Sequence, residues 1–260
     1  MREERTMGLR WPEQLWIVRH GQSAGNVARE AAQQANLERI ALVSRDVDVP
    51  LSPLGERQSL ALGHWFASLP RDERPESVLV SPYRRAMQTA TLIREGGGFD
   101  ADEPLCLDER LREKEFGIID GLTARGLARL MPDQADFRAS LGKFYHRPPG
   151  GESWCDVILR LRSLLDTVAL HYAGRRVLIV AHHVVVLCLR YVLEKMDEAT
   201  ILGIDAEQQL ANCSVTQYRH DADAGPGGGL VLERYNFVAP IEEEAVAVTR
   251  AKDVQVAVRG

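Results

Sequence analysis

Three short apolar runs stand out against the otherwise mixed pattern of hydrophobic and polar positions in this chain. They are LWIV at 15–18, SVLV at 77–80 and RVLIVA at 176–181. Each run is rich in β-branched residues and is followed at once by polar groups, which is typical of a central strand buried on both faces. We therefore predict three buried strands at these positions.

Helical patterns separate these strands. Ser52 and Pro53 have the character of an N-cap and a first helical residue, and they lead into a helix over 54–69. A second helix is predicted at 84–95, where three glycines stop it at 96–98. A third is predicted from about Trp154 to Tyr172, because its apolar residues fall on one helical face: Val157, Leu161, Leu164, Leu165 and Val168.

Strands that alternate with helices pair in parallel through crossover connections, and helices then cover both faces of the sheet. The pattern therefore predicts an α/β fold. Near the end of the chain, 214–220 and 230–238 alternate like two hairpin strands at the sheet edge. The glycine-rich stretch 221–230 between them is expected to be a mobile loop.

Length and composition limit the organisation of the chain. It has 260 residues, of which 45% are hydrophobic and 27% charged, as in an ordinary globular protein. Since no repeat or Pro/Ser-rich linker is evident, we expect one domain over 1–260, with a core at about 13–220 and a C-terminal hairpin and tail at about 221–260. The net charge of -5 argues against a global basic field for nucleic acid, so any anion site must be a local cluster.

The same features suggest the compartment. The charged N-terminus lacks the apolar segment of a signal peptide, and the longest apolar run, VVVLCL, is far shorter than the roughly 20 residues that span a membrane. Four widely spaced cysteines form no Cys-x-x-Cys pair and are expected to be reduced thiols: Cys106, Cys155, Cys188 and Cys213. We therefore expect a soluble, cytoplasmic protein.

Basic side chains follow each of the three predicted strands. Ligands of a parallel sheet bind beyond the carboxyl ends of its strands. The residues found there are Arg19 and His20, then Ser81, Arg84 and Arg85, then His182 and His183. One Arg or His after a strand is usually a solvated loop residue, but repetition at all three ends predicts a site for a dianion such as phosphate.

Five motifs carry a family resemblance over about residues 15–190. In order they are RHGQSAGN, PLSPLGERQ, SPYRRAMQTA, LREKEFG and VAHH. This series resembles the histidine phosphatase superfamily, also called phosphoglycerate mutase-like. The resemblance implies a three-layer α/β/α sandwich with a mostly parallel central sheet. It also implies a histidine acid-type phosphatase, that is, a phosphoric monoester hydrolase acting on a small phosphorylated metabolite through a phosphohistidine.

The resemblance also implies roles for individual residues. His20 matches the nucleophile, which must be neutral at its attacking nitrogen, and Glu113 matches the acid that protonates the leaving oxygen. Without the family, Glu113 would be a surface carboxylate in a charged stretch with Glu109 and Glu115. The expected catalytic and phosphate-binding partners are Arg19, Ser23, Asn26, Arg85, His182 and His183. No metal or other cofactor is expected, because the arginines supply the positive charge.

Three functions remain open: phosphomonoesterase, cofactor-dependent phosphoglycerate mutase, and non-catalytic phosphate-binding module. The mutases carry an adjacent arginine pair, whereas this chain has only the separated Arg138, Lys143 and Arg147. Although YHRPPGGES resembles the fructose-2,6-bisphosphatase branch, Gly150 and Leu187 stand where that branch has a lysine and an arginine. We therefore favour hydrolysis of a monophosphate with an uncharged or apolar remainder.

Two further features bear on specificity. Glu152 and Ser153 of the GGES stretch match residues common to many phosphatase members. The segment 27–49 has the pattern of an extra helix, which would either pack or wall the pocket. The sequence does not fix the oligomeric state, and a homodimer is left open.

Overall fold

A six-stranded mixed sheet forms the centre of the computed structural model, which describes residues 10–42, 44–207, 209–225 and 228–250. In spatial order the strands are β3 (Leu105–Leu107), β2 (Ser77–Val80), β4 (Arg176–Ala181), β1 (Gln14–Arg19), β5 (Val215–Asp221) and β6 (Gly229–Phe237). The first four are parallel, and β5 and β6 are antiparallel to their neighbours. The three predicted strands and the mostly parallel α/β sheet are confirmed.

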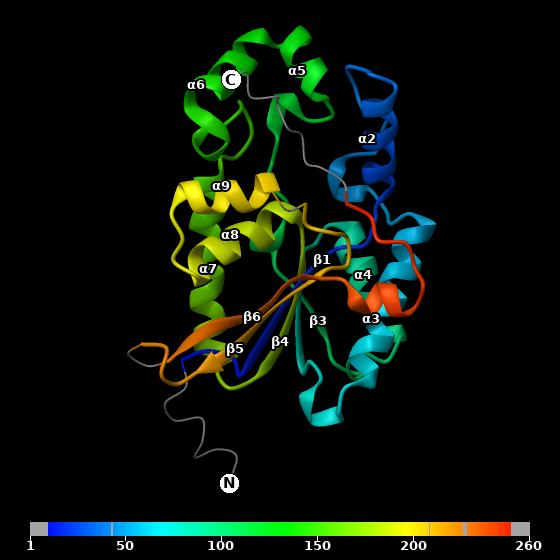
Figure 1. Ribbon diagram of the computed structural model, residues 1–260, viewed down its shortest axis with the longest axis vertical. Helices are drawn as coiled ribbons and strands as arrows, with labels where there is room; N and C mark the ends of the chain where they lie inside the picture. The colour runs from blue at the N-terminus through cyan, green and yellow to red at the C-terminus, as the bar shows by residue number, and fades with distance from the viewer. Residues whose placement is uncertain (1–9, 43, 208, 226–227, 251–260) are drawn as a thin grey trace.

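Helices cover both faces of this sheet (Figure 1). One face packs on α3 (Pro53–Ser68), α4 (Arg84–Glu95) and α10 (Ala239–Glu243), and the other on α7 (Trp154–His171), α8 (His183–Leu193) and α9 (Glu198–Glu207). In β1, Trp16 and Val18 join the first core while Leu15 and Ile17 join the second. All four are buried, which explains why the strand sequences are continuously apolar.

The helix ends lie close to the positions that the sequence predicts. The Ser52 side chain accepts a hydrogen bond from the Gly55 amide at the start of α3, and Gly96 caps the end of α4. At the start of α7, Ser153 and Asp156 form a reciprocal capping box. Each cap satisfies backbone groups that the helix leaves unpaired.

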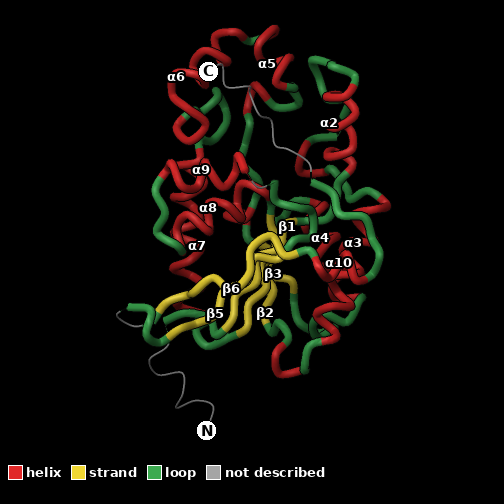
Figure 2. Tube along the Cα trace, in the orientation of Figure 1, coloured by secondary structure: helices red, strands yellow, loops and turns green. Residues whose placement is uncertain are grey.

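Three more helices extend beyond the sheet: α2 (Ala24–Gln34), α5 (Ala124–Leu130) and α6 (Pro132–Tyr145). They form the upper end of the molecule in Figure 2. The extra helix expected within 27–49 is therefore only partly present, because α2 ends at Gln34. The described residues after it form no helix until a short 3₁₀ helix, η1 (Asp46–Asp48). Further 3₁₀ turns are η2 (Arg71–Glu73), η3 (Glu109–Leu111) and η4 (Gly117–Ile119).

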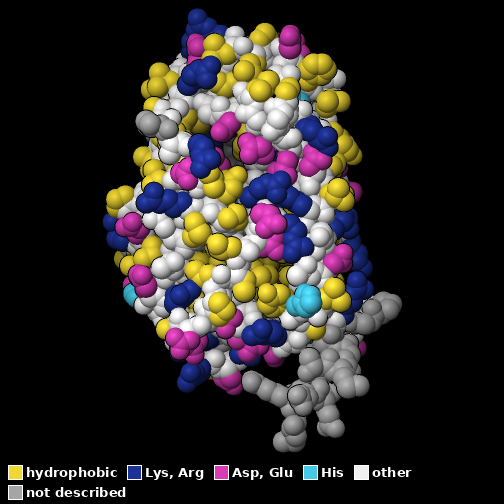
Figure 3. Space-filling view, turned by 180° about the vertical axis from the view of Figure 1, so that it is seen from behind, with side chains coloured by type: hydrophobic (Ala, Val, Ile, Leu, Met, Phe, Trp, Pro, Cys, Tyr) yellow, Lys and Arg dark blue, Asp and Glu magenta, His cyan; other side chains and the backbone are white. Residues whose placement is uncertain are grey.

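The predicted C-terminal hairpin is present as β5 and β6 at one sheet edge. Within the loop expected at 221–230, residues 226–227 lie outside the described part of the chain, as does the charged N-terminal stretch 1–9. No helix among the described residues combines the length and the hydrophobicity needed to cross a membrane. Charged side chains of both signs are interspersed on the face shown in Figure 3.

Candidate active site

A cavity of about 370 Å³ lies beyond the carboxyl end of β1. Six of the residues expected from the sequence line it: Arg19, His20, Ser23, Asn26, Arg85 and Glu113. His182 lies beside them, with its ring centroid 5.1 Å from that of His20. Residues from four separate parts of the chain therefore meet at one place, because the carboxyl ends of parallel strands share one sheet edge.

His20 is held in the state that a nucleophile requires. Its Nδ1 lies 2.7 Å from the Gly21 carbonyl oxygen, which can only accept, so Nδ1 carries the proton and Nε2 keeps its lone pair. Arg85 Nε donates to that Nε2 at 3.2 Å. Burial lowers the pKa of His20 well below its ordinary value, and the charges of Arg85 and Arg19 lower it further. The imidazole is therefore neutral near pH 7.

The backbone around His20 is fixed from three directions. Asn212 Nδ2 donates to the His20 carbonyl at 3.1 Å, and the Gly21 amide donates to Thr89 Oγ1 at 3.0 Å. A side chain at residue 21 is excluded, since a Cβ there would lie 2.5 Å from the Gly55 carbonyl oxygen. No sequence signal indicated Asn212, which lies 192 residues from His20 along the chain.

His182 is held by a side-chain contact. Its Nε2 lies 2.7 Å from Ser81 Oγ, which also accepts from the Tyr83 amide at 3.3 Å. If the hydroxyl donates to Nε2, Nδ1 carries the proton. This buried Nδ1 has no hydrogen-bond partner among the described residues. In this tautomer it provides a donor for an anion oxygen placed next to His20.

The RHGQSAGN stretch forms the start of α2. The Ser23 side chain accepts from the Asn26 amide at 3.1 Å, and the Asn26 side-chain oxygen accepts from the Ser23 amide at 3.0 Å. Because its oxygen is engaged, Asn26 has its side-chain NH₂ available for a ligand. Arg19 also lines the cavity, and one end of its guanidinium donates to the Leu210 carbonyl.

Glu113 is buried at 6% exposure, and its Oε1 accepts from the Lys114 amide at 2.9 Å. Glu109 and Glu115, the two carboxylates most easily confused with it, are exposed and do not line the cavity. Burial therefore distinguishes the candidate acid from its neighbours, which the charged sequence pattern could not do.

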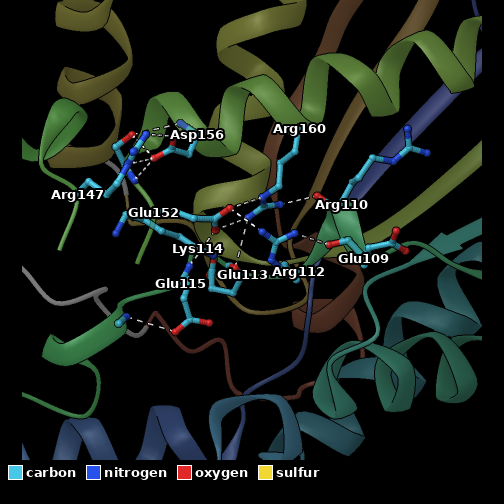
Figure 4. A network of polar contacts seen from close by, with 12 residues as sticks. Glu109, Arg110, Arg112, Glu113, Lys114, Glu115, Arg147, Glu152, Asp156 and Arg160 are labelled. Carbon is cyan, nitrogen blue, oxygen red and sulfur yellow. Dashed lines mark hydrogen bonds and ion pairs between the residues drawn. The ribbon is translucent and has the colours of Figure 1, made fainter. Parts of the chain in front are cut away.

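A charged network holds the loop that carries Glu113 (Figure 4). The Glu152 carboxylate accepts from Arg112 at 2.8 Å, from Arg160 at 2.9 Å and 3.1 Å, and from the Glu115 amide at 3.0 Å. Arg160 in turn reaches the Glu113 carbonyl oxygen at 3.4 Å. Glu152 of the GGES stretch therefore acts as the support for this loop rather than as a cavity residue.

His183, which was expected to contact phosphate, lies elsewhere. Its Nε2 is 2.9 Å from Asp205 Oδ1, and Asp205 also pairs with Lys143. Burial raises the pKa of Asp205, but its bonds to His183 and Lys143 outweigh burial and lower it to about 2. His183 does not line the cavity.

The two arginines that follow β2 differ in burial. Arg84 is exposed on the first turn of α4, whereas Arg85 is buried.

Four charged residues line the cavity without having been expected from the sequence: Arg29, Arg39, Asp46 and Asp120. Arg29 comes from α2, Arg39 from the irregular segment after it, Asp46 from η1 and Asp120 from the loop after η4. Asp46 forms an ion pair with Arg85, in which Oδ1 is 3.0 Å from Nη1 and Oδ2 is 3.1 Å from Nη2.

Residues 15–228 match the family model described as histidine phosphatase superfamily (branch 1). The chain belongs to the histidine phosphatase superfamily. A probable phosphoglycerate mutase GpmB of Yersinia enterocolitica is 27% identical over 239 residues, which cover 90% of this chain and 97% of that protein. The structure of a mycobacterial glucosyl-3-phosphoglycerate phosphatase with VO3 is 27% identical, with a TM-score of 0.65 over 86% of this chain and 99% of that one. Bacillus stearothermophilus YhfR, 24% identical, shares the fold with a TM-score of 0.68 over 88% and 98% of the two chains.

Proposed function

We propose that this histidine phosphatase superfamily member is a phosphomonoesterase that hydrolyses a small phosphorylated metabolite through a phosphohistidine at His20. The observation that carries the proposal is the state of the His20 ring, which is buried and neutral. Its Nδ1 proton is directed to a backbone carbonyl, and its Nε2 belongs to a cavity that Glu113 also lines. A neutral imidazole held in this way can attack phosphorus, and Glu113 is the carboxyl group able to serve the leaving oxygen.

In the first step, the phosphoryl oxygens bind to the side chains of Arg19, Arg85, Asn26 and His182. The Nε2 lone pair of His20 then forms a bond to phosphorus while the bond from phosphorus to the ester oxygen breaks. Protonated Glu113 donates its proton to that oxygen, so the product leaves as an alcohol. The guanidinium groups stabilise the charge that spreads over the equatorial oxygens in the transition state.

In the second step, water attacks the phosphohistidine. The Glu113 carboxylate accepts a proton from this water as its oxygen bonds to phosphorus. The bond from phosphorus to nitrogen breaks, and the electron pair returns to Nε2 of His20. Inorganic phosphate is released, Glu113 is again protonated, and the enzyme has returned to its starting state.

The basic residues before GGES favour hydrolysis over the mutase reaction. A mutase must hold a sugar acid while the phosphoryl group returns to it, which calls for further cations in the pocket. Lys143 pairs with Asp205, Arg147 pairs with Asp156, and neither they nor Arg138 line the cavity. The similarity to a probable phosphoglycerate mutase keeps the mutase as the second candidate.

The cavity lining changes one expectation about the substrate. The sequence predicts an uncharged or apolar remainder, but among the described residues of the lining only Ile40, Leu42 and Phe116 are large and apolar. Arg29 and Arg39 line it as well, beyond the proposed phosphate clamp. We therefore infer that the remainder of the substrate is polar.

The test is phosphate release from a panel of phosphorylated metabolites, measured with and without 2,3-bisphosphoglycerate. We expect release without that additive, and an acid-labile phosphoenzyme after rapid quenching. His20→Ala should abolish both, whereas His64→Ala, a change at an exposed histidine of α3, should affect neither. Turnover that requires 2,3-bisphosphoglycerate and isomerises phosphoglycerate would instead establish the mutase. A His20→Ala protein with full activity would disprove the phosphohistidine mechanism.

A further inference from the structure

Asp46 occupies the donors of Arg85 that a phosphate group would need. Besides the two contacts of its carboxylate, its carbonyl oxygen accepts from Arg85 Nη1 at 2.6 Å. Arg85 Nε donates to Nε2 of His20 at 3.2 Å. Since a guanidinium has five N–H donors, these contacts leave one of them for a ligand.

The geometry of this pair is the geometry of anion recognition. Two nitrogens of one guanidinium face two oxygens of one anionic group, as in bidentate contacts of arginine with phosphate. Asp46 lines the same cavity as His20 and Glu113. The two carboxylate oxygens therefore occupy the positions on Arg85 that two phosphate oxygens would take.

Two contacts besides those with Asp46 also hold Arg85. Its guanidinium carbon lies 5.0 Å from the centroid of the Tyr83 ring, and its Nε is directed to His20. The Arg85 side chain is only 5% exposed, so without a ligand its buried charge needs a counter-ion. Asp46 provides that counter-ion from a side chain that is 38% exposed. A half-buried carboxylate at the cavity wall can turn into water at small cost, which makes the pair replaceable.

We propose that Asp46 is a tethered competitor of phosphate: it neutralises Arg85 in the free enzyme, leaves when a phosphoryl group binds, and returns to help release the product. This proposal rests on the proposed phosphate site. A competitor of this kind weakens the binding of every anion at the site. The apparent Kd equals the intrinsic Kd divided by the fraction of free molecules in which Arg85 is available. It would keep the arginine clamp from retaining inorganic phosphate after each turnover.

The proposal predicts opposite signs for two measurements on Asp46→Asn. The free protein should be less stable to urea, because Arg85 loses its counter-ion. Binding of inorganic phosphate and of orthovanadate should become tighter, by roughly tenfold if Asp46 holds Arg85 in nine of ten free molecules. The KM for p-nitrophenyl phosphate should fall in parallel. Asp48→Asn is the matched control, because Asp48 belongs to the same 3₁₀ helix but pairs with Arg45, away from the cavity.

Weaker phosphate binding in Asp46→Asn would overturn the proposal and make Asp46 a residue that positions Arg85 for the ligand. Unchanged binding would overturn it too. If the variant does not fold, a crystal structure of the unaltered protein with vanadate decides, since Asp46 must then have left Arg85. Because anion binding is measured without turnover, these results do not depend on the protein being a phosphatase. A protein that binds vanadate as expected but releases no phosphate would contradict the proposed function alone.

Discussion

Glu152→Gln should weaken the contacts that hold the loop carrying Glu113, while it changes no residue that lines the cavity. The Glu152 carboxylate accepts four hydrogen bonds, three of them from Arg112 and Arg160. Glutamine keeps one acceptor oxygen and has no charge, so at least two of the four hydrogen bonds to the carboxylate are lost. Hydrogen bonds to charged groups contribute about 1.5 kcal/mol each at the lower end of their range. We therefore expect a loss of about 3 kcal/mol in the free energy of unfolding.

The burial of the pair supports this magnitude. The side chains of Glu152 and Arg160 are 12% and 10% exposed, so water screens their interaction little, whereas Arg112 at 36% contributes less. Burial raises the pKa of Glu152, but the hydrogen bond and charge of Arg160 outweigh it and leave the pKa below its ordinary value. The contribution is therefore complete above the ordinary pKa of about 4.3 and is lost as the pH falls below it. The stability difference between the two proteins should shrink over that acidic range.

The kinetic consequence follows from the contact of Arg160 with the Glu113 carbonyl. When Arg160 loses its charged partner and keeps only neutral acceptors, we expect Glu113 to shift, and a misplacement of about 1 Å can reduce a rate by about 10²-fold. We expect kcat for alkyl phosphates to fall by about 30- to 100-fold and kcat for p-nitrophenyl phosphate by less than about threefold, since p-nitrophenolate needs little protonation.

The matched control is Glu194→Gln, which weakens a pair of similar burial with Arg190 outside the cavity. It should lower stability without changing the preference for leaving groups. Glu152→Gln protein that folds and shows equal losses for both substrates would refute the argument. So would the same change of preference in Glu194→Gln.

Two further predictions concern proton transfer and pH. Glu113→Gln should reduce kcat for sugar phosphates by about 10²-fold or more and kcat for p-nitrophenyl phosphate far less; equal losses would assign the acid to another group. Burial, followed by the charge of Arg85, lowers the pKa of His20 and His182, so the unfolded chain takes up protons first as the pH falls. Urea unfolding should show stability declining below about pH 6.5, by at most about 1.4 kcal/mol per histidine per pH unit. His182→Asn should flatten this slope and His64→Asn should not; identical slopes in all three proteins would contradict the argument.

Much of the sheet could be predicted because its signal is local. Each of the strands β1, β2 and β4 is buried on both faces, so the sequence is apolar throughout and changes character where the strand ends. That abrupt change also places Arg19, His20 and His182 at one edge without knowledge of any contact. Capping residues such as Ser52 are equally local, since they bond to amides three residues away.

The local pattern of apolar and polar residues does not show in which direction each of two neighbouring side chains points. His182 and His183 are adjacent, and both follow the same strand. Successive residues at the start of a helix point about 100° apart, so only one of them can face His20. His182, the N-cap of α8, lies beside His20, and His183 is turned toward Asp205 on α9. The sequence contained no sign of Asp205 as a partner 22 residues away.

The charged side chains of the cavity come from distant segments of the chain. Their sum favours a protonated carboxyl group when substrate is bound, as the proposed mechanism requires of Glu113. Four arginines and three carboxylic acids line it, which leaves one net positive charge when all are ionised. A phosphate dianion would turn this into one net negative charge, and a single added proton would restore neutrality. Excess negative charge in a site favours the protonated form of a nearby carboxyl group. Binding a substrate dianion therefore favours uptake of one proton by the carboxyl groups of the cavity. Of these groups, Glu113 is the one that donates a proton to the leaving oxygen in the proposed mechanism.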